Sequence, residues 1–183
     1  MKSAVVSLVL LATALAAQAQ QAIVPAQSEI TFTSRQMGVP VDGKFKTFSA
    51  QVAFDPAKLA TSKIAFTVDT GSADISREAN GELPKAVWFN VAAFPKATFT
   101  SSSIKKLDAT KYEVAGKLAI KGVTSDVVVP VTLAQNGATA VASGAFPIKR
   151  LTFRIGEKEW ADTSMVADEV QVKFKIALTG VKL

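Results

Sequence analysis

An all-β fold that closes into a barrel is predicted by alternating strands that nearly all carry one apolar face. The clearest strand covers residues 169–182, where Val170, Val172, Phe174, Ile176 and Leu178 share one parity and polar residues occupy the other. Side chains of a strand point alternately to opposite faces, so this segment has one dry face and one wet face. Several other segments repeat the pattern. Closure into a barrel covers the dry face and removes the exposed sheet edges.

Residues 1–19 have the pattern of a cleavable signal peptide. Met1 and Lys2 give a short basic start, residues 4–17 are apolar, and Ala17-Gln18-Ala19 is a small-x-small cleavage site. The apolar stretch is shorter than the ~18 residues of a membrane-spanning helix, which disfavours an uncleaved anchor. We therefore expect cleavage after Ala19, export to the periplasm, and a single domain over residues 20–183.

The composition excludes several classes of function. The chain has 183 residues, a formal net charge of +6, and neither cysteine nor histidine. Its basic residues are spread along strands, so no nucleic-acid partner is expected, although the charge is compatible with a transient membrane contact. Without cysteine the fold has no disulfide and no thiolate metal site, and we expect no metal and no cofactor. The oligomeric state stays open, a dimer included.

Strand positions follow from the alternation and from the turn residues between apolar runs. We expect strands at residues 29–34, 39–54, 63–70, 97–104, 112–120, 126–133, 139–148, 151–155 and 169–182. Phe45 and Phe48 are out of phase, so the second strand is expected to bulge near Lys46 and Thr47. Asn136-Gly137 predicts a type I′ hairpin turn.

Two segments break the strand rhythm. Residues 72–95 predict a helical lid or plug between two strands. In it, Ser76 is the N-cap of a short helix and Pro84 opens a second helical turn over residues 84–89. Residues 156–168 predict a long loop.

Six motifs follow one another in the order of a known family. They are Ser28-x-Ile30-x-Phe32, Val41-x-Gly43-x-Phe45-x-x-Phe48, Val52-x-Phe54-Asp55-Pro56, Trp88-Phe89-Asn90-Val91-x-x-Phe94-Pro95-x-x-x-Phe99-x-Ser101, Gly116-x-Leu118-x-Ile120-x-Gly122-Val123-Thr124, and Ile148-x-Arg150-x-x-Phe153-x-Ile155-Gly156. From about residue 28 to residue 178, the chain resembles the YceI-like family of exported, polyisoprenoid-binding proteins. The resemblance implies an eight-stranded antiparallel lipocalin-like barrel with a short helical insertion. It also implies that the barrel holds a polyprenyl phosphate or a quinone-like chain.

Phenylalanines on the inward parity are the candidates for an apolar lining. They are Phe32, Phe45, Phe48, Phe54, Phe66, Phe99, Phe146, Phe153 and Phe174. Taken singly, each of them is better explained as plain core, because small barrels often fill themselves with side chains. As a set, however, the phenylalanines are expected to lie opposite a row of small residues, Ala50, Ser101, Gly116 and Ser143. Small residues opposite large ones leave a slot in which a ligand could bind. Trp88 and Trp160 are expected to cap the barrel ends.

Three arginines are candidates for binding a ligand head group. Arg35, Arg77 and Arg150 are chosen because a guanidinium binds phosphate through two parallel hydrogen bonds. The alternative for Arg35 and Arg77 is a solvated surface charge. The alternative for Arg150 is a structural pairing with an inner carboxylate.

These features predict a periplasmic binding or carrier protein for an isoprenoid or other long-chain lipid, with no catalytic step. Burial of the lipid chain in the barrel contributes ~0.8 kcal/mol of binding free energy per CH₂ group without any polar contact. Residues 76–89 and 156–168 are expected to control access to the interior. Two alternatives stay open: a stress-linked interaction protein whose barrel is filled, and a lipid-modifying enzyme, which the lack of His and Cys disfavours.

Overall fold

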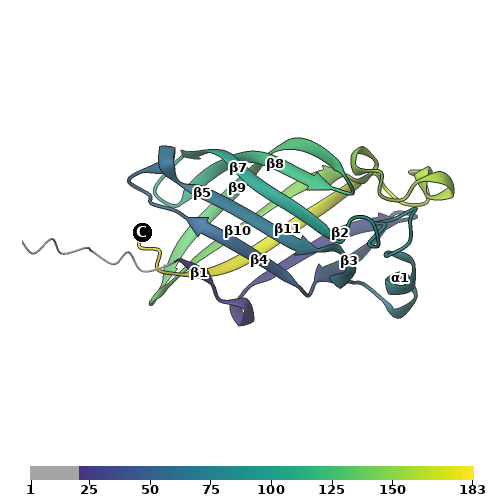
Figure 1. The fold of residues 1–183 in the computed structure, drawn as a ribbon, viewed down its shortest axis with the longest axis horizontal. Helices are drawn as coiled ribbons and strands as arrows, with labels where there is room; N and C mark the ends of the chain where they lie inside the picture. Colours follow the sequence, from purple (N-terminus) through teal and green to yellow (C-terminus); the bar gives the residue numbers. More distant parts are fainter. Residues whose placement is uncertain (1–20) are drawn as a thin grey trace, which may run out of the picture.

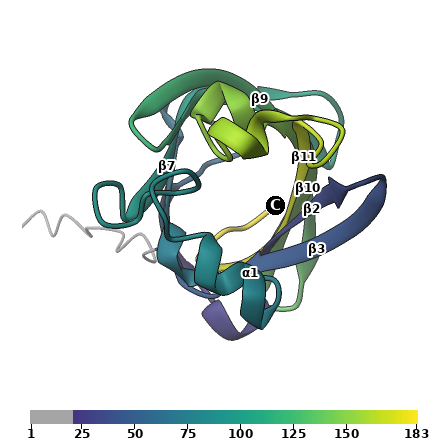
Figure 2. The same ribbon diagram turned by 90° about the vertical axis from the view of Figure 1, so that its right-hand side faces the viewer.

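The computed structural model describes residues 21–183, so the predicted signal peptide lies outside the described residues. The chain forms one antiparallel sheet that curls into a barrel (Figures 1 and 2), which confirms the predicted fold class. The strands are β1 (Ala22–Ile23), β2 (Glu29–Gln36), β3 (Val39–Phe45), β4 (Phe48–Ala53), β5 (Lys63–Asp69), β6 (Ala73–Asp74), β7 (Lys96–Lys106), β8 (Lys111–Ile120), β9 (Val123–Asn136), β10 (Thr139–Lys149) and β11 (Glu169–Thr179). The helix α1 spans Arg77–Glu82, and 3-10 turns occur at η1 (Pro25–Gln27), η2 (Leu59–Thr61), η3 (Thr70–Ser72), η4 (Arg150–Phe153) and η5 (Lys158–Ala161).

The barrel closes because one long strand changes partners half-way. The hydrogen-bonded order is β4-β5-β7-β8-β9-β10-β11-β2-β3-β6, so the consecutive strands β3 and β4 stand near opposite ends of it. They are the two halves of the predicted strand 39–54, and the break falls at Lys46 and Thr47, where the bulge was predicted. If β3 and β4 count as one bent strand and the two-residue β1 and β6 are set aside, the predicted eight strands remain.

Short segments join the two edges of the sheet at either end. At one end the Lys46 N–H donates to the Ser72 carbonyl (3.1 Å), and the Asp69 N–H donates to the Thr47 carbonyl (3.0 Å). At the other end β1 pairs with β11. There the side-chain amide of Gln21 bonds both backbone groups of Phe54, at 2.6 and 2.7 Å.

The structure corrects the predicted strand 151–155. Residues 150–153 form η4, and the chain turns back so that the Ile155 N–H donates to the Arg150 carbonyl (3.0 Å). Arg154 adopts a left-handed conformation with φ 56°. The alternation of apolar residues does reflect burial, since Phe153 and Ile155 are both buried. It predicted a strand wrongly because a tight turn, and not one face of a strand, buries them.

The lid and the hairpin turn differ from their predictions in detail. Ser76 caps α1 as predicted, since its hydroxyl accepts the Ala79 N–H at 3.2 Å. The predicted helical turn over residues 84–89 is wrong: this segment is a series of hydrogen-bonded turns. The segment is followed by Asn90, which has a left-handed backbone with φ 50°. The β9–β10 hairpin forms, but its strands extend to Asn136 and Thr139, and only Gly137 of the turn has a positive φ, so the turn is not type I′.

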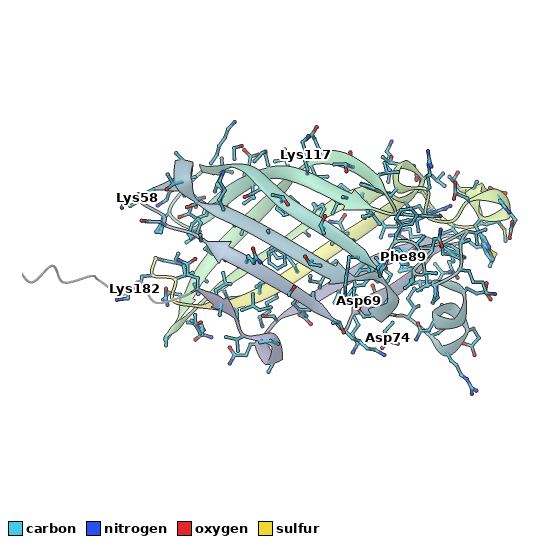
Figure 3. The ribbon with its side chains drawn as sticks, in the orientation of Figure 1. Lys58, Asp69, Asp74, Phe89, Lys117 and Lys182 are labelled. Carbon is cyan, nitrogen blue, oxygen red and sulfur yellow. The ribbon has the colours of Figure 1, made fainter. Side chains whose placement is uncertain are left out.

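The two ends of the barrel carry different structures. Figure 1 shows α1 and the segment after β10 at one end, with the C-terminus and β1 at the other. Figure 3 places Phe89 at the α1 end, whereas Lys58 and Lys182 lie at the opposite end and Lys117 lies on the outside. At the end opposite α1, Val181 is buried in the main apolar cluster together with Leu178. Within residues 21–183 no helix has both the length and the apolarity that a membrane crossing requires.

Candidate functional site

An apolar cavity of about 490 Å³ occupies the barrel interior. Its volume lies within the ~300–1,000 Å³ range typical of small-molecule sites in proteins. The dry face predicted for β11 lines it in full, namely Val170, Val172, Phe174, Ile176 and Leu178. Every other main strand also contributes apolar side chains, so the interior is a container with almost no polar surface.

The cavity stays open because three aromatic rings lie against glycines of neighbouring strands. Phe32 is directly opposite Gly43, and Phe174 is directly opposite Gly144. A Cβ atom on Gly144 would stand 2.6 Å from the Phe174 ring, and one on Gly116 would stand 2.6 Å from the Phe99 ring. Real side chains do not approach so closely. The missing side chains therefore let these rings cover the wall instead of projecting into the lumen.

The predicted aromatic lining is largely brought together by the fold. Phe32, Phe45, Phe54, Phe66, Phe99, Phe146 and Phe174 line the cavity. Phe48 packs beside the main apolar cluster, and Phe153, the last residue of η4, is buried in the second apolar cluster; neither lines the cavity.

The predicted row of small residues is only partly where it was expected. Ser143 faces outward, because it pairs with Lys175 on the wet face of β11. Ala50 and Ser101 do not line the cavity, and the Ser101 hydroxyl instead accepts the Ile64 N–H at 2.9 Å. Glycines on the inward parity, rather than small residues in general, are what make room.

The two predicted gating segments meet at one end of the cavity. Ser76, Glu78, Ala79 and Glu82 line it from the α1 side, and Trp160 and Val166 line it from the side of loop 156–168. Trp88 and Trp160 lie at this same end with ring centroids 5.4 Å apart, so they do not cap opposite ends.

Arg150 lines the cavity, but its guanidinium is fully engaged by the backbone. Its Nε, Nη1 and Nη2 groups donate five hydrogen bonds of 2.6 to 3.0 Å to five carbonyl oxygens, those of Ile155, Gly156, Trp160, Val166 and Ala167. A guanidinium has five N–H donors, so none is left free. Desolvation lowers the pKa of Arg150, and the nearby Asp168 carboxylate opposes that shift. This arginine organises loop 156–168 at the α1 end of the cavity, which we call the mouth.

The other two candidate arginines lie outside the cavity lining. Arg35 is exposed and donates from Nη1 to the Gly38 carbonyl at 3.2 Å. Arg77 is exposed at the start of α1.

A buried lysine fixes the same loop from the other side. Lys121 donates from Nζ to the Arg154 carbonyl (2.6 Å) and to the Glu157 carboxylate (2.9 Å). The hydrogen bond from Lys121 lowers the pKa of Glu157. Together with Arg150, this contact gives the mouth a defined shape.

Several cavity residues were missed from the sequence. Phe89 is buried, lines the cavity and stacks edge-on against Phe45 at 6.1 Å. Tyr112 lies near the other end, with its ring 5.6 Å from that of Phe54. Phe89 belongs to a segment without strand periodicity, so alternation could not place it. Tyr112 was on an inward parity and could have been included.

Comparisons with known proteins agree with this architecture. The model of the YceI-like domain matches residues 22–178, which is most of the chain. The chain belongs to the YceI-like family. Protein YceI of Salmonella arizonae is 36% identical over 96 residues, which make up 52% of this chain and 50% of that protein. This YceI-like chain thus spans about half the length of the curated relatives it matches.

Solved structures extend the similarity to the whole barrel. BcnA of Burkholderia cenocepacia is 48% identical, with a TM-score of 0.82 over 85% of this chain and 98% of that one. The YceI protein of Campylobacter jejuni is 26% identical, with a TM-score of 0.68 over 75% and 83% of the two chains. A polyisoprenoid-binding domain from Saccharophagus degradans has a TM-score of 0.69 over 87% and 98%, but at 12% identity it shares the fold alone.

The packing of the Phe32 ring against Gly43 predicts the effect of the substitution Gly43→Ala. The new methyl group would overlap the far end of the Phe32 ring and the Ile75 side chain, so the ring must swing into the lumen. We expect a loss of about 1–3 kcal/mol in the free energy of unfolding, measured by urea denaturation, as for other overpacked sites. The same variant should bind the apolar fluorescent probe N-phenyl-1-naphthylamine more weakly.

Gly81→Ala is the matched control, because nothing lies within 4 Å of the added Cβ and the position is in a helix. It should leave probe binding unchanged and stabilise the protein slightly. Equal probe binding by Gly43→Ala and the wild type would contradict the role given to this glycine.

Proposed function

We propose that this YceI-like domain binds an isoprenoid lipid and acts as a periplasmic carrier for it, without a catalytic step. The observation that carries the proposal is the apolar cavity of about 490 Å³ inside the barrel. A polyprenyl chain entering it would leave water at a gain of ~0.8 kcal/mol per CH₂. The name of the Saccharophagus relative, a polyisoprenoid-binding domain, agrees with this ligand class.

The open interior supports binding over the two alternatives. A barrel that served only as an interaction scaffold would be expected to fill its lumen with side chains. For catalysis, perturbed acids or bases would be expected in the cavity. The described carboxylates with a lowered pKa, such as Asp69 and Glu157, do not line it. Arg150 lines it and also has a lowered pKa, but all five of its N–H donors are engaged by backbone carbonyls.

Two alanines of β10 offer a matched test. Ala142 lines the cavity, whereas Ala145 is exposed on the outer face and pairs with Lys173. Ala142→Phe should fill lumen volume and weaken binding of geranylgeraniol by about 2 kcal/mol, or roughly thirtyfold, since it displaces a few CH₂ groups. Ala145→Phe should leave the affinity unchanged. Dye displacement measures both, and equal affinities of the two variants would contradict binding inside the barrel.

We infer further that the α1 end of the barrel contacts the membrane during transfer. Gln36 and Val166 line the cavity and form an antiparallel bridge, and the adjacent Met37 donates its N–H to the Met165 carbonyl at 2.9 Å. Met37 is 72% exposed, Val39 63% and Met165 45%. Large apolar side chains gathered beside a lipid cavity favour contact with a bilayer surface.

The double variant Met37→Ser/Met165→Ser should slow the transfer of a fluorescent polyprenyl lipid out of phosphatidylglycerol-containing vesicles several-fold. Its equilibrium affinity for soluble geranylgeraniol should not change, because neither methionine lines the cavity. Val128→Ser, at a residue of β9 that is 57% exposed, is the control and should transfer normally. An unchanged transfer rate in the double variant would refute this contact.

A further inference from the structure

Two leucines are exposed at the end of the barrel opposite α1. Leu107, in the connection between β7 and β8, is 59% exposed, and Leu183, which follows β11, is 51% exposed. Tyr112, at the start of β8, and Val181 both belong to the main buried cluster. Single exposed leucines are common on protein surfaces, so the charges around these two decide what they indicate.

Lysines are enriched around these leucines. Figure 3 shows Lys58 and Lys182 at this end of the barrel. The turn that holds Lys58 and the hairpin of β7 and β8 meet there, since the Phe54 and Tyr112 rings lie 5.6 Å apart. The exposed lysines of these segments and of the residues after β11 are Lys58, Lys63, Lys105, Lys106, Lys111 and Lys182. The carboxylates of the same segments are Asp55, Asp108 and Glu113.

We call this the basic end, because its balance of charge differs from that of the α1 end. It has six lysines and three carboxylates, whereas residues 77–85 and 150–169 at the α1 end hold five basic and seven acidic residues. Lys111 is 3.7 Å from Asp108, and the Lys106 ammonium is 5.8 Å from the centre of the Tyr112 ring. The other four lysines make no ion pair among residues 21–183, namely Lys58, Lys63, Lys105 and Lys182. Their charge is available to a partner.

The mixture of free lysines and exposed leucines favours one kind of partner. A soluble polyanion, such as an acidic protein, would use the charge and leave the leucines in water. A bilayer that contains anionic lipids uses both, because lysines pair with the head groups while apolar side chains enter the boundary with the acyl chains. The long stem of a lysine also lets its charge stay in water beside a buried leucine.

We propose that the basic end is a docking surface for an anionic lipid bilayer, in which Leu107 and Leu183 enter the head-group region. This contact needs no ligand in the barrel, and it is separate from the contact inferred at the α1 end. A protein docked in this way points its mouth away from the bilayer on which it rests and presents it to a second surface.

Co-sedimentation with vesicles tests the docking, with protein to which no lipid ligand has been added. The protein should bind vesicles of equimolar phosphatidylglycerol and phosphatidylcholine but not vesicles of phosphatidylcholine alone. Added NaCl should weaken the binding, because it screens surface charge. Binding to both kinds of vesicle with equal affinity would contradict the proposal.

Two triple variants separate the surface from the net charge. Lys58→Gln/Lys105→Gln/Lys182→Gln should weaken binding to the phosphatidylglycerol vesicles about 100-fold, which corresponds to ~1 kcal/mol for each lysine. The matched control takes the same charge from exposed lysines on three other strands and should bind nearly as tightly as the wild type; it is Lys44→Gln/Lys149→Gln/Lys175→Gln. Equal losses in the two variants would overturn the assignment of the basic end.

The leucines distinguish a bilayer from a soluble polyanion. Leu107→Ser/Leu183→Ser should weaken vesicle binding several-fold, and unchanged binding would overturn the bilayer as the partner. Because the chain has no cysteine, an environment-sensitive dye can be attached at Leu107→Cys or, as a control on the wall of β9, at Val128→Cys. The dye emission should shift to the blue on the vesicles at position 107 and not at position 128. A shift at position 128 alone would place the contact elsewhere on the barrel.

Discussion

The cavity depends on how this barrel packs three phenylalanine rings against its own wall. Phe32, Phe99 and Phe174 each lie over a glycine of a neighbouring strand, so their apolar area is buried against the sheet. A barrel of about eight strands can instead fill its interior with side chains. Here the rings follow the wall, and the lumen keeps about 490 Å³ of apolar space. The same residues thus stabilise the fold and create the surface on which a lipid chain would lie.

The two ends of this container are built differently. At one end, Val181 enters the main apolar cluster and Gln21 ties the chain to Phe54, which closes the barrel. At the other end, two buried cations organise the covering loop: Arg150 gathers five carbonyl oxygens, and Lys121 holds Glu157. Both cations donate their hydrogen bonds to oxygen atoms of the protein itself, so few polar groups at the mouth remain for a ligand. A site of this kind favours recognition by shape and burial over recognition by charge.

Periodicity predicted the barrel because alternation directly reports which side chains share a face. It placed seven of the nine candidate phenylalanines in the cavity lining. It failed where burial arises without a strand: the alternation from Leu151 to Ile155 belongs to a tight turn around Arg150. The roles of Gly43 and Gly144 also escaped prediction, because register across strands decides which glycine lies under which ring. For the same reason the sequence could nominate Arg150 but could not show that all its donors are engaged.

The central claim is that the barrel is a container for an isoprenoid lipid. It is tested most directly by native mass spectrometry of the protein purified from the cells that naturally produce it, followed by organic extraction of any bound molecule. The account predicts a stoichiometric adduct that is released as an isoprenoid. A protein that is isolated without an adduct, and that stays so after incubation with polyprenyl lipids, would contradict it.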